Sequence, residues 1–290
     1  MIEKTGLLTE GFGSFYTVEV DGMLVEARAR GRLKKDNIRL LIGDMVTLEK
    51  EQDVYAITGI LPRKNQLIRP AVAKIESIVV VIAAASPDPN YKQTDKLLAF
   101  LEHKNIDVSI CINKTDLKNA DEIKNIYEKA GYKVITMNEN EPCVELAEIL
   151  KNKVSAFAGC SGVGKSTIIN ALDEDYNRQT GSVGKIKRGR HTTTHTKLLH
   201  LKGGGYIADT PGFSVVDISD IEADDLYKYF REFNKYADKC KFTGCVHLSD
   251  EHCEITKQVK NGVISSSRYE SYLSLYDELN SLYKQYRKEK

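Results

Sequence analysis

The sequence predicts a multidomain α/β protein, and three observations support this fold class. Residues 1–68 contain short strand-like runs separated by turn residues, with no helical pattern. Residues 69–218 alternate apolar strand-like runs with helical patterns, which is typical of a parallel sheet covered by helices. Residues 219–290 show helical spacing around a group of Cys and His residues. We therefore expect three domains with these boundaries.

The composition is that of an ordinary globular protein. The chain has 290 residues, of which 41% are hydrophobic and 29% are charged. It contains no apolar run near the ~20 residues that span a bilayer, and its first residues lack the apolar core of a secretory signal. We expect a cytoplasmic monomer with no membrane partner and with its six cysteines reduced.

The first part is predicted to be a β-barrel. Strand-like residues 15–20 and 23–27 flank Asp21-Gly22, a strong two-residue hairpin signal. Two further runs, at 44–49 and 54–60, continue the pattern. Evenly spaced strands without a helix favour an OB-fold.

Basic residues are clustered although the formal net charge is only +1. This charge argues against a strongly basic nucleic-acid binder, but local patches can still bind phosphate groups. The run at 286–290 is interpreted as solvated surface. In the barrel, one face of a strand would carry Arg28, Arg30, Arg32 and Lys34, which share one parity.

The second part has the pattern of a parallel sheet. Residues 75–84 form a continuous apolar run, as expected of a strand covered on both faces. A helical pattern at 92–104 and a strand at 107–112 follow. The alternation continues with a helix at 118–130, a strand at 132–136, a helix at 144–151 and a strand at 154–158.

A phosphate-binding loop follows that last strand. Residues 159–166 read G-x-x-x-x-G-K-S and lead into a helical pattern. The glycines let backbone N–H groups surround phosphates, Lys165 neutralises the β and γ oxygens, and Ser166 binds Mg²⁺. The predicted nucleotide-binding residues here are Gly159, Cys160, Ser161, Gly162, Val163, Gly164, Lys165, Ser166 and Thr167.

A guanine-reading motif precedes this loop. Asn113, Lys114, Thr115 and Asp116 form N-K-T-D at the end of a buried strand. Asp116 can accept hydrogen bonds from guanine N1–H and from the exocyclic amine, a pattern that adenine does not offer. ATP would leave this carboxylate unpaired, so the motif favours GTP and GDP. Asn113 would hold the loop and approach the base, and Lys114 would cover the ring.

Two further segments are expected to contact the γ-phosphate and Mg²⁺. Asp209-Thr210-Pro211-Gly212 follows a short strand, so that Asp209 would reach Mg²⁺ through water and the Gly212 N–H would sense the γ-phosphate. Thr193, in a loop-like segment, would supply another Mg²⁺ ligand and become ordered with GTP. The motif order is base, phosphate, then magnesium. This order predicts a circularly permuted P-loop GTPase domain.

The residue that activates water is not obvious from these motifs. Phe213 stands where many small GTPases carry a glutamine, and phenylalanine cannot orient water. His191 is the nearest polar candidate in the sequence. It either takes this catalytic role or only contacts RNA or packs locally.

The cysteine cluster predicts a structural zinc site. Cys240, Cys245, His247 and Cys253 supply three thiolates and one imidazole, which suits a closed tetrahedral Zn²⁺. His252 is a competing ligand, but its adjacency to Cys253 disfavours simultaneous binding. We expect one structural zinc per chain. A stripe of Tyr and Leu residues at helical spacing, from Tyr269 to Tyr286, is predicted to be core packing.

Together these features resemble the RsgA (YjeQ) family of circularly permuted GTPases. The resemblance covers nearly the whole chain and rests on N-K-T-D, G-C-S-G-V-G-K-S-T, G-R-H-T-T-T, D-T-P-G-F and C-x4-C-x-H-x5-C. It implies an OB-fold domain, a permuted GTPase domain and a C-terminal helical zinc-binding domain. It also implies GTP hydrolysis stimulated by the 30S subunit during late maturation, binding to 16S rRNA, and a catalytic role for the histidine matched by His191.

One departure and two alternatives remain. The family presents Ser-Ala to guanine after the strand at 133–135, where this chain has Thr136-Met137-Asn138. A P-loop ATPase or kinase is an alternative that Asp116 opposes. A non-enzymatic RNA-binding scaffold with GTP as a structural ligand is another, which Phe213 keeps open.

Overall fold

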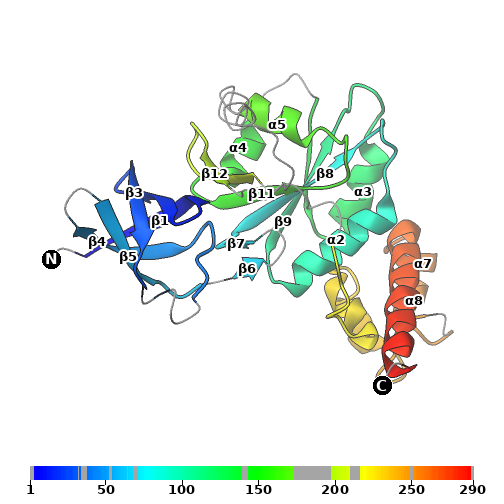
Figure 1. Cartoon of the computed structure of the whole chain (residues 1–290). Coiled ribbons are helices and arrows are strands. Elements are labelled where there is room, and N and C mark those ends of the chain that lie inside the picture. The colour runs from blue at the N-terminus through cyan, green and yellow to red at the C-terminus, as the bar shows by residue number, and fades with distance from the viewer. Residues whose placement is uncertain are drawn as a thin grey trace. The chain divides into compact units, whose positions relative to one another are not determined.

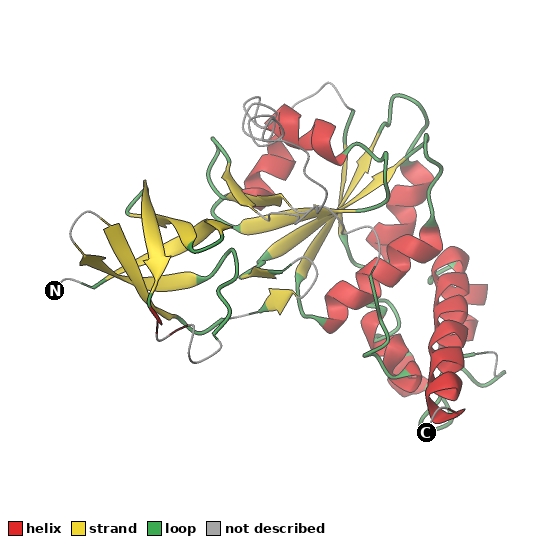
Figure 2. Ribbon diagram, viewed as in Figure 1, coloured by secondary structure: helices red, strands yellow, loops and turns green. Residues whose placement is uncertain are grey.

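The structure is a computed structural model of the chain. It describes residues 3–31, 33, 38–51, 54–63, 65–67, 71–138, 143–172, 197–209, 216–248 and 251–288 (Figures 1 and 2). The chain divides into two compact units. The first consists of Met1–Ile78, Pro142–Phe157 and Ile168–Phe213, and the second of Val79–Glu141, Ala158–Thr167 and Ser214–Lys290.

The first unit contains a closed five-stranded barrel of the predicted OB-like kind. Its strands are β1 (Lys4–Phe12), β2 (Phe15–Val20), β3 (Met23–Ala29), β4 (Met45–Glu51) and β5 (Val54–Ile60). Antiparallel β1–β4 pairing and parallel β3–β5 pairing close the ring. Fully buried side chains from all five strands fill it, including Leu8, Val18, Ala27, Leu48 and Ile57.

The predicted hairpin is present between β2 and β3. Asp21 and Gly22 both have positive φ, at +51° and +78°. Positive φ at both central residues matches the twist of the flanking strands, which is why Asp-Gly is favoured in such turns.

The first unit also contains several strands and a helix outside the barrel. These elements are β6 (Gln66–Leu67), β7 (Val72–Ala73), α4 (Val144–Leu150), β11 (Val154–Ala158), β12 (Lys197–His200) and β13 (Tyr206–Asp209). Strands β11 and β13 pair in parallel, so their carboxyl ends lie at the same edge. Strand β12 is antiparallel to β13 and also pairs with barrel strand β1 at Glu10 and Lys197.

The second unit contains the other parallel strands, in the spatial order β10-β9-β8. Its elements are α2 (Tyr91–His103), β9 (Asp107–Asn113), α3 (Asp121–Lys129) and β10 (Lys133–Thr136), with most of β8 (Ser77–Ala83). Every residue of β8 is buried, as the continuous apolar run predicts. The phosphate-binding residues before helix α5 (Lys165–Leu172) also belong to this unit.

The C-terminal segment of the second unit is helical. It comprises the 3₁₀ helices η2 (Ala223–Tyr229) and η3 (Ala237–Lys239) and the α-helices α7 (Glu254–Lys260) and α8 (Ser266–Lys288). The expected core role of the tyrosine stripe is confirmed for Tyr272, Tyr276 and Leu279, which are buried together with Phe230 and Phe233. The side chains of Tyr283 and Tyr286 lie outside the described residues. In the part of the chain that the structure describes, no helix has both the length and the apolar character needed to cross a membrane.

A buried ion network joins α2 to the C-terminal segment. The Arg268 guanidinium donates to both Glu232 carboxylate oxygens, at 2.7 and 3.1 Å, and to Asp95 at 2.6 Å. All three side chains are at most 5% exposed. Burial raises the pKa of Asp95, although Arg268 opposes this shift. One cation therefore compensates two buried carboxylates.

We predict that Arg268→Leu destabilises the second unit by about 3–5 kcal/mol at neutral pH, because it leaves two buried carboxylates without a cation. A carboxyl group with a raised folded-state pKa contributes stability at low pH that is lost as pH rises through that pKa. The loss should therefore shrink as pH falls toward the acidic range. Urea unfolding of both proteins at several pH values measures it.

Arg231→Leu provides the control. Arg231 pairs with Glu102 at 2.7 Å, but it is 32% exposed on the surface of the same unit. Its loss should cost about 1 kcal/mol or less. Equal destabilisation by the two substitutions would contradict the importance given to burial.

Candidate nucleotide site and metal centre

Three glycines shape the phosphate loop, which we define as residues 159–164 between β11 and α5. Gly159, Gly162 and Gly164 have φ values of +136°, +81° and +95°. A Cβ on Gly159 would lie 2.4 Å from the carbonyl oxygen of Val81, so a larger residue would collide with backbone. All three positions favour glycine because of their positive φ, and Gly159 also because of this close approach.

Lys165 is held over the loop by the loop's own backbone. Its ammonium donates to the carbonyl oxygens of Gly159 and Cys160, at 2.8 and 2.7 Å. Burial lowers the pKa of this half-buried lysine. The charge is thus placed beside the loop backbone, at the start of helix α5, where phosphate oxygens would be stabilised.

The guanine motif, residues 113–116, is bonded directly to the phosphate loop. Asn113 is fully buried at the end of β9, and its Nδ2 donates to the carbonyl oxygen of Val163 at 3.0 Å. The Lys114 ammonium donates to the carbonyl of Gly162 at 2.8 Å and also to that of Ser86. Two motifs that are about 50 residues apart, and in reversed order, therefore form one structural unit.

The segment after β10 lies next to the guanine motif. The Thr115 hydroxyl donates to the carbonyl oxygen of Met137 at 3.2 Å, and the Met137 N–H donates to that of Ile112 at 2.9 Å. Asp116 is exposed at this position. The Thr136-Met137-Asn138 segment thus lies beside the guanine motif, and a contact from it to the base stays a prediction.

Several predicted residues cannot be placed from the described part of the chain. His191, Thr193, Gly212 and Phe213 lie outside the described residues. Asp209 is the last residue of β13, but its side chain is not among those described. Their assigned roles remain predictions.

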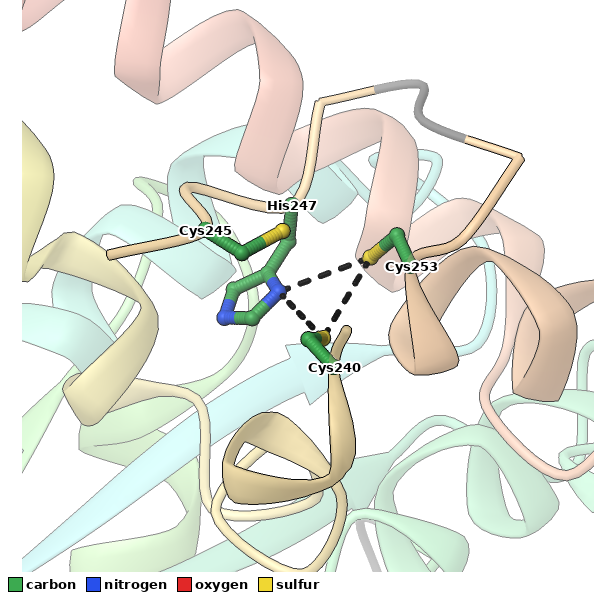
Figure 3. A group of neighbouring side chains, drawn as sticks. All are labelled: Cys240, Cys245, His247 and Cys253. Carbon is green, nitrogen blue, oxygen red and sulfur yellow. Dashed lines mark hydrogen bonds between the residues drawn. The ribbon is translucent and has the colours of Figure 1, made fainter. Parts of the chain in front are cut away.

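The four predicted metal ligands come together in the C-terminal segment (Figure 3). The thiol sulfurs and the imidazole nitrogen of Cys240, Cys245, His247 and Cys253 all lie within 4.8 Å of one another. The Nδ1 atom of His247 is 3.5 Å from the sulfurs of Cys240 and Cys253, which are 3.9 Å apart. Tetrahedral zinc with ordinary bond lengths requires about 3.6 Å for nitrogen–sulfur and about 3.8 Å for sulfur–sulfur separations. The cluster therefore fits a tetrahedral metal ion.

Helix α8 positions the histidine of this cluster. The Tyr272 hydroxyl donates to the carbonyl of Val246 at 2.6 Å, and the Tyr269 hydroxyl donates to those of His247 and Leu248. These bonds hold His247 at φ +58°. Burial lowers the pKa of His247, which favours the neutral imidazole that binds metals.

His252 and the barrel arginines have other contacts. The His252 ring packs edge-on against Phe242 rather than joining the cluster.

In the barrel, the Arg28 guanidinium lies 4.5 Å from the centre of the Phe15 ring. Arg30 donates to Glu49 at 2.6 Å and to Glu51 at 2.7 Å. The expected row along one strand is wrong, because β3 ends at Ala29 and both Gly31 and Leu33 are helical. Arg32 and Lys34 lie outside the described residues.

Sequence reasoning missed two residues beside the phosphate loop. Ser86 accepts from Lys114 through its backbone carbonyl, which has no side-chain signature. Gln93 on α2 accepts from the Cys160 thiol at a sulfur–oxygen distance of 3.6 Å. No motif marks Gln93, because its position is set by the packing of α2.

The chain matches two family models. Residues 5–57 match the RsgA N-terminal domain, and residues 60–219 match the RsgA GTPase. Among relatives named small ribosomal subunit biogenesis GTPase RsgA, the protein of Agathobacter rectalis is 40% identical, covering 96% of this chain and 98% of its own. The Enterococcus faecalis protein is 38% identical, covering 99% of each.

Two solved structures are similar over nearly the whole chain. The crystal structure of YloQ, described as a circularly permuted GTPase, has a TM-score of 0.82 and 29% identity, covering 97% of this chain and 96% of its own. That of YjeQ from Thermotoga maritima has a TM-score of 0.81 and 31% identity, covering 96% and 99%. By family models, full-length relatives and fold, this chain belongs to the RsgA family of circularly permuted GTPases.

Proposed function

We propose that this protein binds GTP and hydrolyses it to GDP and phosphate during biogenesis of the small ribosomal subunit. The observation that carries the proposal is the direct bonding of Asn113 and Lys114 to the phosphate loop. These bonds connect the predicted guanine-binding residues to the predicted phosphate-binding loop, which supports a single site for both parts of the nucleotide. The family and the names of its members support the biological role.

The chain's own residues would divide the work of catalysis. Backbone N–H groups of 159–164 and the Lys165 ammonium would stabilise negative charge on the phosphates. Asp116 would select guanine. Ser166, Thr193 and Asp209 would hold Mg²⁺, which would neutralise charge on the β and γ oxygens. His191 would orient the attacking water, since Phe213 offers no polar group.

The same proposal includes the partners and the metal. The 30S subunit and its 16S rRNA would bind the protein and stimulate hydrolysis, and the protein would act as a monomer in the cytoplasm. A single structural zinc would occupy the cluster at Cys240, Cys245, His247 and Cys253. The donor set and the tetrahedral spacing support zinc, and four protein ligands leave no open position for catalysis.

Asp116→Asn tests the nucleotide assignment. An amide at 116 no longer matches guanine, but its NH₂ and carbonyl match the C2 oxygen and N1–H of xanthine. We expect GTP affinity to fall by about 100-fold or more while xanthosine triphosphate becomes the preferred ligand. Titration with both nucleotides measures this. Single-turnover hydrolysis with and without small subunits then tests the enzyme. No acceleration by subunits would contradict subunit-stimulated hydrolysis, and no hydrolysis in either condition would favour a non-enzymatic scaffold.

Cys253→Ser tests the metal assignment. We expect about one zinc per chain in the wild type and in Cys143→Ser, whose thiol lies outside the cluster, but much less in Cys253→Ser. The temperature at which the C-terminal segment unfolds should fall with the metal content. Elemental analysis and thermal unfolding measure both. Full zinc retention by Cys253→Ser would contradict this ligand set.

A matched arginine pair tests the RNA-binding face of the barrel. Arg30 is already paired with two carboxylates, whereas Arg28 stacks on Phe15 and no ion pair with a described residue involves it. Arg28→Ala should weaken binding to small subunits and reduce the salt slope by about 0.7–0.9, the contribution of one phosphate contact. Arg30→Ala should have a smaller effect. Binding assays over several salt concentrations distinguish them, and the reverse ranking would overturn the assignment.

A further inference from the structure

Helix α2 contacts the phosphate loop at its amino-terminal end. Gln93, in its first turn, accepts from the Cys160 thiol. The segment that leads into α2 also touches the loop, because the Lys114 ammonium bonds the carbonyls of both Ser86 and Gly162. A Cβ on Gly162 would lie 3.7 Å from Pro87 of the same segment. The start of α2 and the phosphate loop are therefore in direct contact.

The middle of α2 is attached to α8. Asp95, two residues after Gln93, is fully buried and accepts from Arg268 at 2.6 Å. Lys96, the next residue of α2, pairs at 2.5 Å with Glu278, which lies farther along α8 than Arg268. Because Asp95 and Arg268 are each 1% exposed, this pair is shielded from solvent and from salt.

The same part of α8 holds the metal cluster. Tyr269 follows Arg268 directly, and its hydroxyl donates to the carbonyls of His247 and Leu248. Tyr272, one turn later, donates to Val246. One helical turn thus bonds α2 on one side and the histidine segment of the cluster on the other.

We propose that Gln93 and Asp95 are positioning residues that link the phosphate loop to the metal centre, so that nucleotide and metal strengthen each other's binding. This inference rests on the proposed nucleotide function and goes beyond it. Gln93 contacts the phosphate loop through the Cys160 thiol, and neither Gln93 nor Asp95 belongs to the metal cluster. Each acts through the position of α2, and any coupling between the two sites must be reciprocal.

Metal release provides the test, because it does not depend on hydrolysis. Metal-loaded protein is mixed with a chromogenic zinc chelator, with and without saturating GDP and Mg²⁺. We expect GDP to slow release from the wild type five-fold or more. In Gln93→Ala and Asp95→Ala, the ratio of the two rates should fall close to one. Alanine suits both positions because each lies within a helix.

Two variants serve as controls. Asp95→Asn keeps an oxygen acceptor for Arg268 and should retain most of the GDP effect. Lys124→Ala, which removes an exposed pair with Glu128 on α3, should retain all of it. Circular dichroism and thermal unfolding establish that every variant is folded.

Fluorescent GDP, titrated under the same conditions, separates this proposal from the proposed function. Absence of binding would overturn the GTPase assignment itself. Saturable binding with unchanged metal release would overturn the coupling. A full GDP effect in folded Gln93→Ala and Asp95→Ala would show that these residues do not carry the link.

Discussion

The hydrogen bonds from Asn113 and Lys114 to the phosphate-loop backbone are the contacts on which the nucleotide site depends. They join the end of β9 to the loop that follows β11, so they bring together segments that the permuted chain order separates. Each bond ends on a backbone carbonyl, Val163 or Gly162, and therefore depends on the loop's glycine conformation rather than on a particular side chain. These few bonds therefore hold the guanine motif and the phosphate loop together.

Helix α8 organises the C-terminal segment. The metal cluster, the aromatic core and the buried Arg268 network all involve α8, and two of its tyrosines hold the backbone that carries His247. An ordinary hydrophobic contact could attach this segment to α2, but a buried ion network adds directional bonds that fix its orientation. These bonds hold α8, whose Tyr269 contacts the backbone of His247, against α2.

The barrel is joined to the rest of its unit through strand pairing. Glu10 of β1 lies opposite Lys197 of β12, and the side chains form an ion pair at 3.3 Å. Strand β12 in turn pairs with β13, which ends at the first residue of the D-T-P-G segment. Barrel strand β1 and strand β13, which ends at Asp209, thus belong to one continuous hydrogen-bonded sheet.

Local sequence patterns alone determined the barrel strands, the Asp21-Gly22 hairpin, the buried strand β8, the permuted motif order and the Cys and His cluster. Each is local: turn chemistry, hydrophobic period and ligand type are encoded within a few residues. Tertiary structure decided which side chains meet. The sequence predicts Arg30 on a basic face of the barrel but does not show that Glu49 and Glu51 pair with it. Arg268, Gln93 and the carbonyl of Ser86 carry no sequence signal for their contacts. Long-range pairing depends on how helices and strands pack, and nothing within a single segment records its partner.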